Sequence, residues 1–315
     1  MARMPHVARS LSLCLLTAAL ATACASDGAT GGQNAASEAD AASASASADN
    51  GSASASASSS SMVTNATGAA LDTAIAGAWR SPENSARDKY RHPKETLTYF
   101  GVNADKTVIE ISPAPGWYAE ILAPYLRDNG HYVVATWDDA IPKQPKYRYD
   151  ENKQLRDRMA AHPEVFDKAE VRTYDAKNPS FGPANSADVV LTFRNVHNGV
   201  AEGNAEAYFK AFFDVLKPGG TLGVTDHRAN PGTDLEKMKD SGYLTEDLVV
   251  GYAEKAGFRL DGKSDINANP ADTKDHPNGV WTLPPTNEHD AKDDAKYKAI
   301  GESDRMTLRF VKPAQ

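Results

Sequence analysis

Cysteine is almost absent from this sequence. Two occur in 315 residues, Cys14 and Cys24, and both lie close to the N-terminus. The rest of the chain can therefore form neither a disulfide framework nor a cysteine-ligated metal site. Runs of Lys and Arg are also missing, and the formal net charge is -8. Nucleic-acid-binding domains usually carry a basic surface, so we expect no nucleic acid as a partner.

Two motifs that would identify common enzyme classes are missing as well. The chain has no Gly-x-x-x-x-Gly-Lys-Ser/Thr loop, which argues against an NTPase. It has no Gly-x-Ser-x-Gly elbow, which argues against a serine hydrolase. Hydrophobic residues make up 41% of the chain and charged residues 24%, as in ordinary soluble proteins. The composition therefore allows a packed core.

An apolar run at residues 11–23 lies near the N-terminus, behind Arg3 and Arg9. It is shorter than the about 20 residues that a membrane-spanning helix needs. A positive start, a short apolar run and small residues before a cleavage site are typical of a secretory signal. We therefore expect residues 1–23 to be a signal peptide.

The end of this run, Leu20-Ala21-Thr22-Ala23-Cys24, resembles the lipobox of bacterial lipoproteins. In that motif, cleavage leaves the cysteine as the lipidated first residue, although Ala21 occupies a position that is usually Leu. The expected protein is exported to the periplasm and attached to the membrane only through a lipid on Cys24. The alternative is cleavage after Ala23 or Ala25, which gives a soluble periplasmic protein.

Residues 24–67 consist mainly of Ala, Ser, Gly, Asn and Asp. Such a segment has little apolar surface to bury and cannot offset the entropy that is lost on ordering. We expect a solvated tether between the lipidated cysteine and a single folded domain, residues 68–315.

From residue 68 onward, short β-branched runs alternate with helical patterns, which predicts βαβ units and a mostly parallel sheet. The expected fold class is α/β, a doubly wound Rossmann-like sheet with an N-terminal helical extension. Strands are predicted at 107–111, 131–137, 170–174, 188–193, 221–225, 259–260 and 306–311, with helices at 118–126, 153–161, 205–216 and 245–256. Ligands of such sheets bind at the carboxyl ends of the strands. The polar stretch 267–302 is expected to cover this cleft.

The turn after the first predicted strand carries small residues at Ser112, Ala114 and Gly116, the spacing of a Gly-x-Gly-x-Gly turn with two glycines replaced. Small side chains allow a bound nucleoside to approach the backbone closely. Pro113 and Pro115 have no N–H group, so the turn is poorly suited to phosphates, which need several backbone donors.

Two carboxylates accompany this turn. Glu110, at the end of the first strand, would repel a pyrophosphate but suits the ammonium group of an amino-acid moiety. Asp138 follows the second strand and can accept hydrogen bonds from both ribose hydroxyls of a nucleoside. Each feature alone is also explained by packing and solvation. Their joint occurrence favours a nucleoside that carries an amino acid over a dinucleotide.

A set of short motifs occurs along residues 79–313. They are Arg87-Asp88, Arg91-His92-Pro93, Glu110-Ile111-Ser112-Pro113, Gly116-Trp117-Tyr118, 193–198, 216–220, Asp226-His227-Arg228 and 301–306. With these motifs the chain resembles a family of predicted class I methyltransferases found in proteobacteria, often exported. The resemblance implies the class I methyltransferase fold and S-adenosylmethionine as cofactor, and it does not identify the acceptor. The expected cofactor site comprises Glu110, Ser112, Ala114, Gly116, Trp117, Tyr118, Asp138 and Asn195.

Polar residues follow the fourth and fifth strands, where class I methyltransferases usually face their acceptor. Arg194 and His197 follow the fourth strand, and Asp226, His227 and Arg228 follow the fifth. Methyl transfer depends mainly on alignment and needs a base only when the acceptor must lose a proton. We predict His197 or His227 as the base for an oxygen acceptor, with Arg194 and Arg228 binding an anionic group on it. The alternative is that these groups only tie loops together.

Two further expectations concern the same region. His197, Asp226 and His227 could converge on a metal, but nothing in their spacing demands one, and we expect none. Arg91-His92 and Asp304-Arg305, from opposite ends of the domain, are expected to close over the site.

The expected function is S-adenosylmethionine-dependent methyl transfer to an unknown small-molecule acceptor. Export conflicts with this expectation, because the cofactor is made in the cytoplasm. Two alternatives therefore stay open. One is an exported, non-catalytic module that binds a small ligand on a methyltransferase fold. The other is a hydrolase or other enzyme that uses the region of His197 and His227 on the same scaffold.

Overall fold

The structure is a computed structural model that describes residues 68–113 and 115–314. The predicted signal peptide, Cys24 and the tether lie outside the described residues, as does Ala114. None of the helices in the described ranges combines the length and the hydrophobicity of a membrane span.

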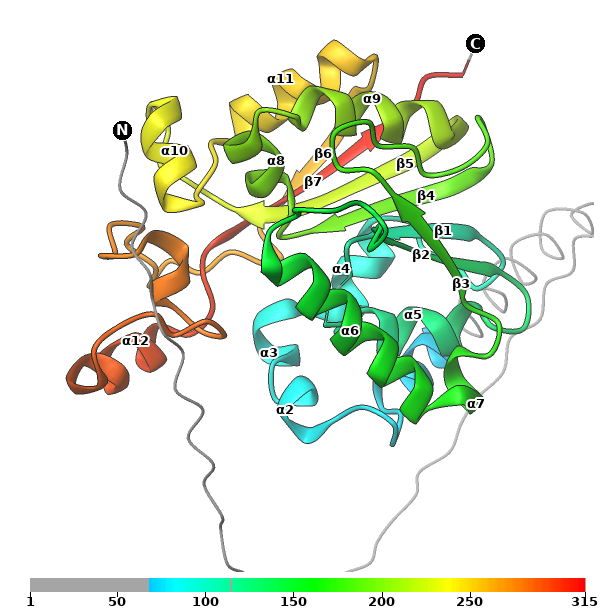
Figure 1. The fold of residues 1–315 in the computed structure, drawn as a ribbon, viewed down its shortest axis with the longest axis horizontal. Helices are drawn as coiled ribbons and strands as arrows, with labels where there is room; N and C mark the ends of the chain where they lie inside the picture. Colours follow the sequence, from blue (N-terminus) through cyan, green and yellow to red (C-terminus); the bar gives the residue numbers. More distant parts are fainter. Residues whose placement is uncertain (1–67, 114, 315) are drawn as a thin grey trace, which may run out of the picture. The chain divides into compact units, whose positions relative to one another are not determined.

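A seven-stranded sheet with the order β3-β2-β1-β4-β5-β7-β6 forms the centre of the fold (Figure 1). Its strands are β1 (Thr107–Ile111), β2 (His131–Trp137), β3 (Glu170–Tyr174), β4 (Ala187–Phe193), β5 (Leu216–His227), β6 (Arg259–Ser264) and β7 (Arg305–Val311). The first five strands are parallel, and β7 runs antiparallel between β5 and β6. The predicted doubly wound, mostly parallel sheet is confirmed. Because the strand order reverses between β1 and β4, the topological switch point lies there.

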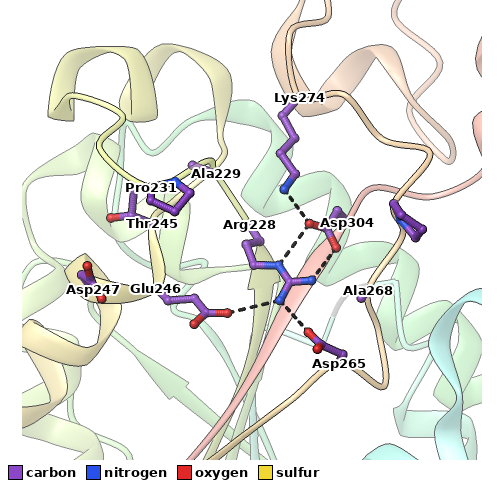
Figure 2. A pocket seen from close by; sticks show the side chains of 11 residues that line it. Arg228, Ala229, Pro231, Thr245, Glu246, Asp247, Asp265, Ala268, Lys274 and Asp304 are labelled. Atoms are coloured by element: carbon purple, nitrogen blue, oxygen red, sulfur yellow. Dashed lines mark hydrogen bonds and ion pairs between the residues drawn. The ribbon is translucent and has the colours of Figure 1, made fainter.

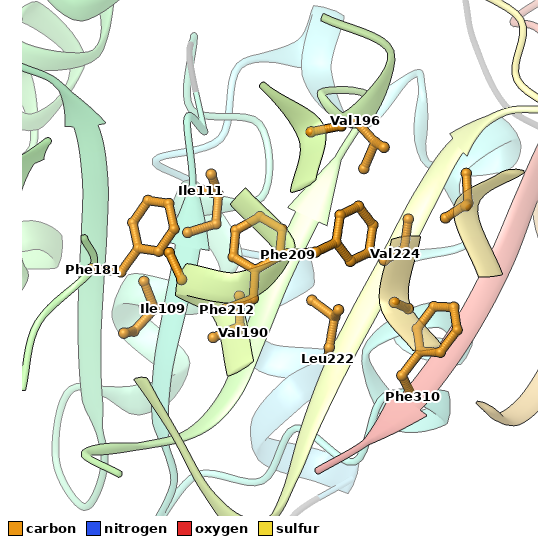
Figure 3. Close-up of a cluster of buried hydrophobic side chains, with 14 of the residues drawn as sticks. Ile109, Ile111, Phe181, Val190, Val196, Phe209, Phe212, Leu222, Val224 and Phe310 are labelled. Carbon is orange, nitrogen blue, oxygen red and sulfur yellow. The ribbon is translucent and has the colours of Figure 1, made fainter. Parts of the chain in front are cut away.

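Helices cover both faces of the sheet. One face carries α8 (Val196–Glu202), α9 (Ala205–Val215), α10 (Leu235–Ser241) and α11 (Glu246–Ala256), and the other carries α4 (Pro93–Tyr99), α5 (Ala119–Leu126), α6 (Lys146–Ala161) and α7 (Pro163–Phe166). The first core lies on the side of α8 to α11, and the second core lies on the side of α4 to α7. Along β1, Ile109 and Ile111 belong to the first core (Figure 3), and Val108 belongs to the second. A strand that is buried on both faces needs apolar residues at successive positions, which is why it reads as an uninterrupted run.

The N-terminal extension consists of short helices. Residues 68–75 are helical, and α2 (Pro82–Ser85) and α3 (Asp88–Arg91) follow before α4. Leu71 and Ala74 are buried in the second core. The helical extension thus packs against the sheet domain and is part of the same folded unit.

Two elements begin earlier than predicted. Helix α6 starts at Lys146 instead of residue 153, and its buried positions include the polar residues Arg148 and Asn152. A helix that buries polar side chains lacks the apolar period by which helices are recognised. Strand β5 starts at Leu216 instead of residue 221, because the Lys-Pro-Gly-Gly segment continues the strand, with a register shift against β4.

The segment 267–302 contains more regular structure than expected. It includes the 3-10 turns η1 (Gly279–Thr282) and η2 (Ala291–Asp293) and the helix α12 (Asp294–Ile300). In Figure 1 it lies beside the end of β5 and the start of β7. The N–H group of Asp304 donates to Asp272 (2.8 Å), and that of Arg305 donates to the carbonyl of Asn267 (3.1 Å). These bonds fasten the segment near the carboxyl ends of the parallel strands, where ligands of this fold bind.

Candidate active site

Two histidines and an aspartate meet at the carboxyl ends of β4 and β5. Asp226 and His227 are the last two residues of β5, and His197 is the second residue of α8. All three side chains are buried. Nδ1 of His197 lies 2.9 Å from Oδ1 of Asp226, and the centroids of the two imidazole rings are 5.1 Å apart. The structure therefore brings together both histidines that were predicted as bases.

Asp226 fixes the orientation of the His197 ring. Besides the imidazole, its carboxylate accepts hydrogen bonds from the backbone N–H groups of His197 (3.1 Å) and His227 (2.8 Å). An ionised Asp226 requires the proton of the His197 ring on Nδ1, so Nε2 carries the free lone pair. The pair has the geometry of a base that a buried acid holds in one tautomer.

His227 contacts a different partner. Its Nδ1 atom lies 2.5 Å from Oγ of Ser303, a residue just before β7. Burial, with further contributions from His197 and Arg194, holds the pKa of His227 well below its ordinary value. The ring is therefore neutral at physiological pH. Ser303 was not predicted, because it is 76 residues away in the chain.

The same three side chains form the candidate metal site of the described residues. Their ligand atoms lie within 4.8 Å of one another. However, Nδ1 of each histidine and both oxygens of Asp226 are already engaged in hydrogen bonds. A metal would have to displace these bonds or bind through the Nε2 atoms. The arrangement suits an oriented base better than a metal centre.

Arg228 does not fit its predicted role as a ligand of an anion. Its guanidinium donates to both oxygens of Asp304 (2.9 and 3.1 Å), to Asp265 (2.8 Å) and to Glu246 (3.3 Å), as Figure 2 shows. The hydrogen bond to Asp304 is the main cause that raises the pKa of Arg228 further above its ordinary value. Three carboxylates surround one cation, with Lys274 also bound to Asp304 (2.8 Å). Arg228 therefore fastens the segment before β7 to the end of β5.

A cavity of about 590 Å³ adjoins Arg228. Glu246, Asp247, Asp265 and Asp304 contribute carboxylates to its walls (Figure 2). This acidic lining would repel an anionic acceptor. The anionic group that the sequence predicts must therefore bind elsewhere.

The turn after β1 has the backbone conformation that its small residues indicate. Ser112 and Gly116 have φ values of 46° and 99°, in the region that favours glycine. The hydroxyl groups of Ser112 and Tyr174 are 2.5 Å apart. A Cβ atom at Gly116 would lie 2.9 Å from Arg158 and 3.1 Å from Leu155. Glycine is therefore required at position 116 because side chains of α6 approach its Cα closely. In the described part of the turn, Ser112 remains the candidate for a ligand contact.

Trp117 and Tyr118 have structural partners in the N-terminal extension. The indole N–H of Trp117 donates to the carbonyl of Asn84 (2.9 Å), and the hydroxyl of Tyr118 donates to the carbonyl of Arg91 (3.2 Å). The Tyr118 ring stacks on Phe193 with centroids 3.8 Å apart. Both residues are almost fully buried. Both side chains therefore hold α2 and α3 onto the sheet, and their place in the cofactor site stays a prediction.

Glu110, in the last part of β1, and Asp138, directly after the neighbouring parallel strand β2, differ in environment. Glu110 is buried and accepts a hydrogen bond from the hydroxyl of Tyr132 (2.5 Å). Burial raises the pKa of Glu110 to about 8, against smaller lowering effects of Tyr132 and Arg91. Asp138 is partly exposed, and its Oδ1 atom accepts the N–H of Ala140 (2.9 Å). Glu110 is thus a largely protonated acid at neutral pH, and Asp138 an accessible carboxylate.

Arg194 and Asn195 connect β4 to α8. Arg194 has a φ of 55°, and its N–H donates to the carbonyl of Thr225 in β5 (2.7 Å). Asn195 is the N-cap residue of α8, and its side-chain oxygen accepts from Asn198 (3.2 Å). This sharp connection turns the chain from the strand into the helix that carries His197.

Arg194 belongs to a group that we call the arginine cluster, which consists of Arg87, Arg91, Arg194 and Arg305 around Glu302. The Glu302 carboxylate accepts hydrogen bonds from Arg87 (2.7 Å), Arg91 (3.0 Å) and Arg305 (2.9 Å). Arg91 and Arg305 thus meet near the site from opposite ends of the domain, as expected from the sequence. Arg87 and Glu302 were not predicted as parts of the site.

The charges of the arginine cluster are strongly coupled. Despite burial, Arg91, Arg305 and Arg87 hold the pKa of Glu302 well below its ordinary value. Burial, together with repulsion from Arg91, lowers the pKa of Arg194 to about 9. Burial also raises the pKa of Glu151 in α6 to about 7, opposed by Arg194. The cluster is therefore a positively charged region beside the two histidines.

Comparisons with known proteins agree with the architecture. No protein-family profile and no curated protein matches the sequence. Among solved structures, the chain is similar to geranyl diphosphate C-methyltransferase from Streptomyces coelicolor A3(2), with 10% identity, a TM-score of 0.50, and coverage of 76% of this chain and 87% of that one.

Two other similar structures are a SAM-dependent methyltransferase from Aquifex aeolicus (14% identity, TM-score 0.49, 74% of this chain and 94% of that one) and the (4+2)-cyclase SpnF (16% identity, TM-score 0.49, 71% and 81%). At such low identity the likeness to the geranyl diphosphate C-methyltransferase, with its TM-score of 0.50, shows the fold alone. The class I methyltransferase fold that was predicted from the sequence is confirmed.

Proposed function

We propose that the chain is an S-adenosylmethionine-dependent methyltransferase that acts on a hydroxyl group of a small molecule. The observation that carries this proposal is the His197–Asp226 pair, with Nδ1 and Oδ1 2.9 Å apart, at the carboxyl end of the sheet of a class I methyltransferase fold. A fold hosts many activities, so the pair, and not the fold, supports the reaction.

His197 acts as the base in this proposal. Its Nε2 atom accepts the proton of the acceptor hydroxyl, since Nδ1 is already committed to Asp226. The imidazolium that forms is stabilised by the buried carboxylate. His227 stays neutral because its pKa is held low by burial, so it does not compete with His197 for the proton. The neighbouring neutral ring also avoids a second positive charge next to the imidazolium.

The residues around β1 and β2 fit a cationic nucleoside donor. S-Adenosylmethionine supplies an electrophilic methyl group when it is bound. Glu110, buried and largely protonated with a pKa of about 8, can ionise next to an ammonium group, which lowers the pKa of a nearby carboxyl. Asp138 offers a partly exposed carboxylate to a ribose. Ser112, directly after β1, offers a hydroxyl.

We further infer that the chain is exported and anchored through a lipid on Cys24, as the sequence pattern of residues 1–24 predicts. An enzyme in that compartment would need a donor supply outside the cytoplasm or would act before export. A non-catalytic ligand-binding module is the second candidate, favoured by the protein contacts that already occupy the Trp117 indole N–H and the space beside Gly116.

Titration calorimetry of the full chain with S-adenosylmethionine and S-adenosylhomocysteine tests the proposal. We expect both ligands to bind. Glu110→Gln and Asp138→Asn should lower the affinity for each ligand at least tenfold while the fold is retained. His197→Ala should bind both ligands as the wild type does. No binding of either ligand to a folded wild-type chain would contradict the proposed function and leave the ligand-binding module.

A further inference from the structure

The arginine cluster carries more positive charge than its own partner offsets. Four guanidinium groups share one carboxylate, that of Glu302, which three of them contact at 2.7 to 3.0 Å. Glu110 is close enough to feel Arg91, but its pKa of about 8 leaves it mostly uncharged at neutral pH. Glu151, which faces Arg194, has a pKa of about 7 and supplies about half a charge.

Several donors of the cluster are also unpaired. Nη2 of Arg87, Nη2 of Arg91 and Nε of Arg305 are buried and have no hydrogen-bond partner among the described residues. Arg91 and Arg305 are only 6% and 3% exposed. A buried charged donor without a partner is destabilising, so these N–H groups indicate a missing acceptor.

A purely structural role does not explain this arrangement. Arg228, which has a structural role, is surrounded by three carboxylates. The cluster shows the reverse ratio, with four cations for one anion. Guanidinium groups gathered around one carboxylate are suited to binding a further oxyanion, because their donors match carboxylate and phosphate oxygens.

The position of the cluster is next to the reacting groups. Arg194 directly follows β4 and is bonded through its N–H to Thr225, the residue before Asp226. Arg305 is paired with His227 in the register of β5 and β7. Arg87 has a side chain that is 21% exposed, and Arg194 is partly exposed. Arg87 and Arg194 are therefore the members of the cluster that solvent reaches.

We propose that the arginine cluster binds a carboxylate or phosphate group of the methyl acceptor, so that the substrate is a small hydroxylated organic acid or phosphate ester. This inference rests on the proposed function. The anion would be held by Arg87, Arg91, Arg194 and Arg305 while the hydroxyl group faces His197. The donor's own carboxylate offers the same chemistry. However, S-adenosylmethionine also bears an ammonium and a sulfonium, so its net charge offsets none of the excess positive charge of the cluster.

The first test is binding of inorganic phosphate to the full chain, measured by calorimetry and thermal unfolding at constant ionic strength against chloride. We expect phosphate to bind and to raise the unfolding temperature. Arg194→Gln should lower the affinity for phosphate at least tenfold. This substitution leaves the Glu302 hydrogen bonds intact, so it is the variant least expected to misfold. Arg87→Gln is the second variant. Arg259→Gln, exposed at the start of β6, is the matched control and should bind as the wild type does. Equal phosphate affinity in Arg194→Gln, Arg87→Gln and wild type, or no effect beyond that of chloride, would overturn the oxyanion site.

The second test separates the two sources of the anion. S-Adenosylmethionine and its decarboxylated analogue are titrated into the wild type and Arg194→Gln. If the acceptor supplies the anion, the two donors bind the wild type with similar affinity, Arg194→Gln leaves both unchanged, and phosphate still binds to the complex with S-adenosylhomocysteine. If only the analogue binds weakly and phosphate competes with S-adenosylmethionine, the cluster holds the donor carboxylate and the acceptor proposal is wrong. Phosphate binding without any donor binding would refute the proposed methyl transfer and the acceptor assignment while keeping the oxyanion site.

Discussion

The Oδ1 atom of Asp226 lies 2.9 Å from Nδ1 of His197, and both residues are buried at the carboxyl ends of adjacent parallel strands. This relationship joins two separate sequence motifs into one chemical unit. It assigns different tasks to two histidines that the sequence alone does not distinguish, because His197 faces an acid and His227 faces the hydroxyl of Ser303.

Asp226→Asn should lower the rate of methyl transfer by about a hundredfold to ten-thousandfold, the usual contribution of a positioned base. The amide can no longer hold the proton of His197 on Nδ1, so Nε2 loses its free lone pair. Formation of S-adenosylhomocysteine, measured with an acceptor that the wild type uses, checks the result. His227→Gln is the comparison and should have a smaller effect. An unchanged rate in Asp226→Asn would exclude His197 as the base.

Glu110→Gln should change how stability depends on pH. The pKa of Glu110 is raised from 4.5 to about 8 in the folded chain. The folded state therefore keeps a proton that the unfolded state loses, and this contribution is fully present below about pH 4.5 and is lost as the pH rises to about 8. Between these values the wild type should lose a few kcal/mol relative to Glu110→Gln, since one pKa unit corresponds to about 1.4 kcal/mol.

Urea unfolding at pH 5, 6.5 and 8 measures this difference. Gln keeps an acceptor for the Tyr132 hydroxyl, so the substitution introduces little change in packing. Asp138→Asn is the control, because its carboxylate is partly exposed. Parallel stability curves for Glu110→Gln and the wild type would show that Glu110 is ionised in the folded protein.

The affinity for S-adenosylmethionine should rise with pH up to about 8. If Glu110 must ionise to face the donor ammonium, binding below that pH releases a proton, and the affinity changes by up to about tenfold per pH unit. Calorimetry in two buffers of different ionisation enthalpy detects the released proton. The dependence should vanish in Glu110→Gln. A pH-independent affinity of the wild type between pH 6 and 8 would contradict a contact between Glu110 and the ammonium.

Arg228→Met should destabilise the domain by about 3 kcal/mol, in the range for breaking a buried ion pair. Asp304, with a side chain that is 5% exposed, would lose its main partner and keep Lys274. Urea unfolding measures the loss, and limited proteolysis should show faster cleavage between residues 267 and 302. Phosphate affinity should not change, in contrast to Arg194→Gln. A loss of phosphate binding in folded Arg228→Met would restore Arg228 as a ligand of the anion.

Cys24→Ser should release the protein from the membrane fraction of a bacterial host that processes lipoproteins. A serine cannot carry the thioether-linked lipid, and no other anchor is predicted. Fractionation and mass spectrometry of the mature N-terminus check this expectation, with Cys14→Ser as the control. A wild-type protein that is cleaved after Ala23 or Ala25 and carries no lipid would contradict the lipoprotein prediction.

The sequence predicted the central strands of the sheet well because these strands are buried on both faces. Runs such as Thr107–Ile111 and Ala187–Phe193 are apolar and β-branched, and few other structures accommodate them. Helix α6 was underestimated because its buried face includes Arg148 and Asn152. Where such a helix begins depends on tertiary hydrogen-bond partners of its polar side chains, and the local sequence does not show these partners.

The candidate site was predicted in part for a similar reason. His197, His227 and Arg194 were recognised because they follow predicted strands, and strand ends converge in a parallel sheet. The pairing of Arg228 with Asp265 and Asp304, or of Arg87 with Glu302, depends on segments that are remote in the chain. No local sequence pattern distinguishes an arginine that is neutralised by three carboxylates from an arginine that shares a single carboxylate with other arginines.

Four consecutive residues just before and at the start of β7 connect nearly every part of the site. Glu302 contacts the arginine cluster, Ser303 contacts His227, Asp304 contacts Arg228, and Arg305 donates to the carbonyl of Tyr90. Glu302 and Arg87 are 215 residues apart. During synthesis Arg87 is therefore added 215 residues before Glu302, and both histidines also precede the segment that organises them. A ribosome-bound chain that has not passed residue 311 should be inert toward ligands.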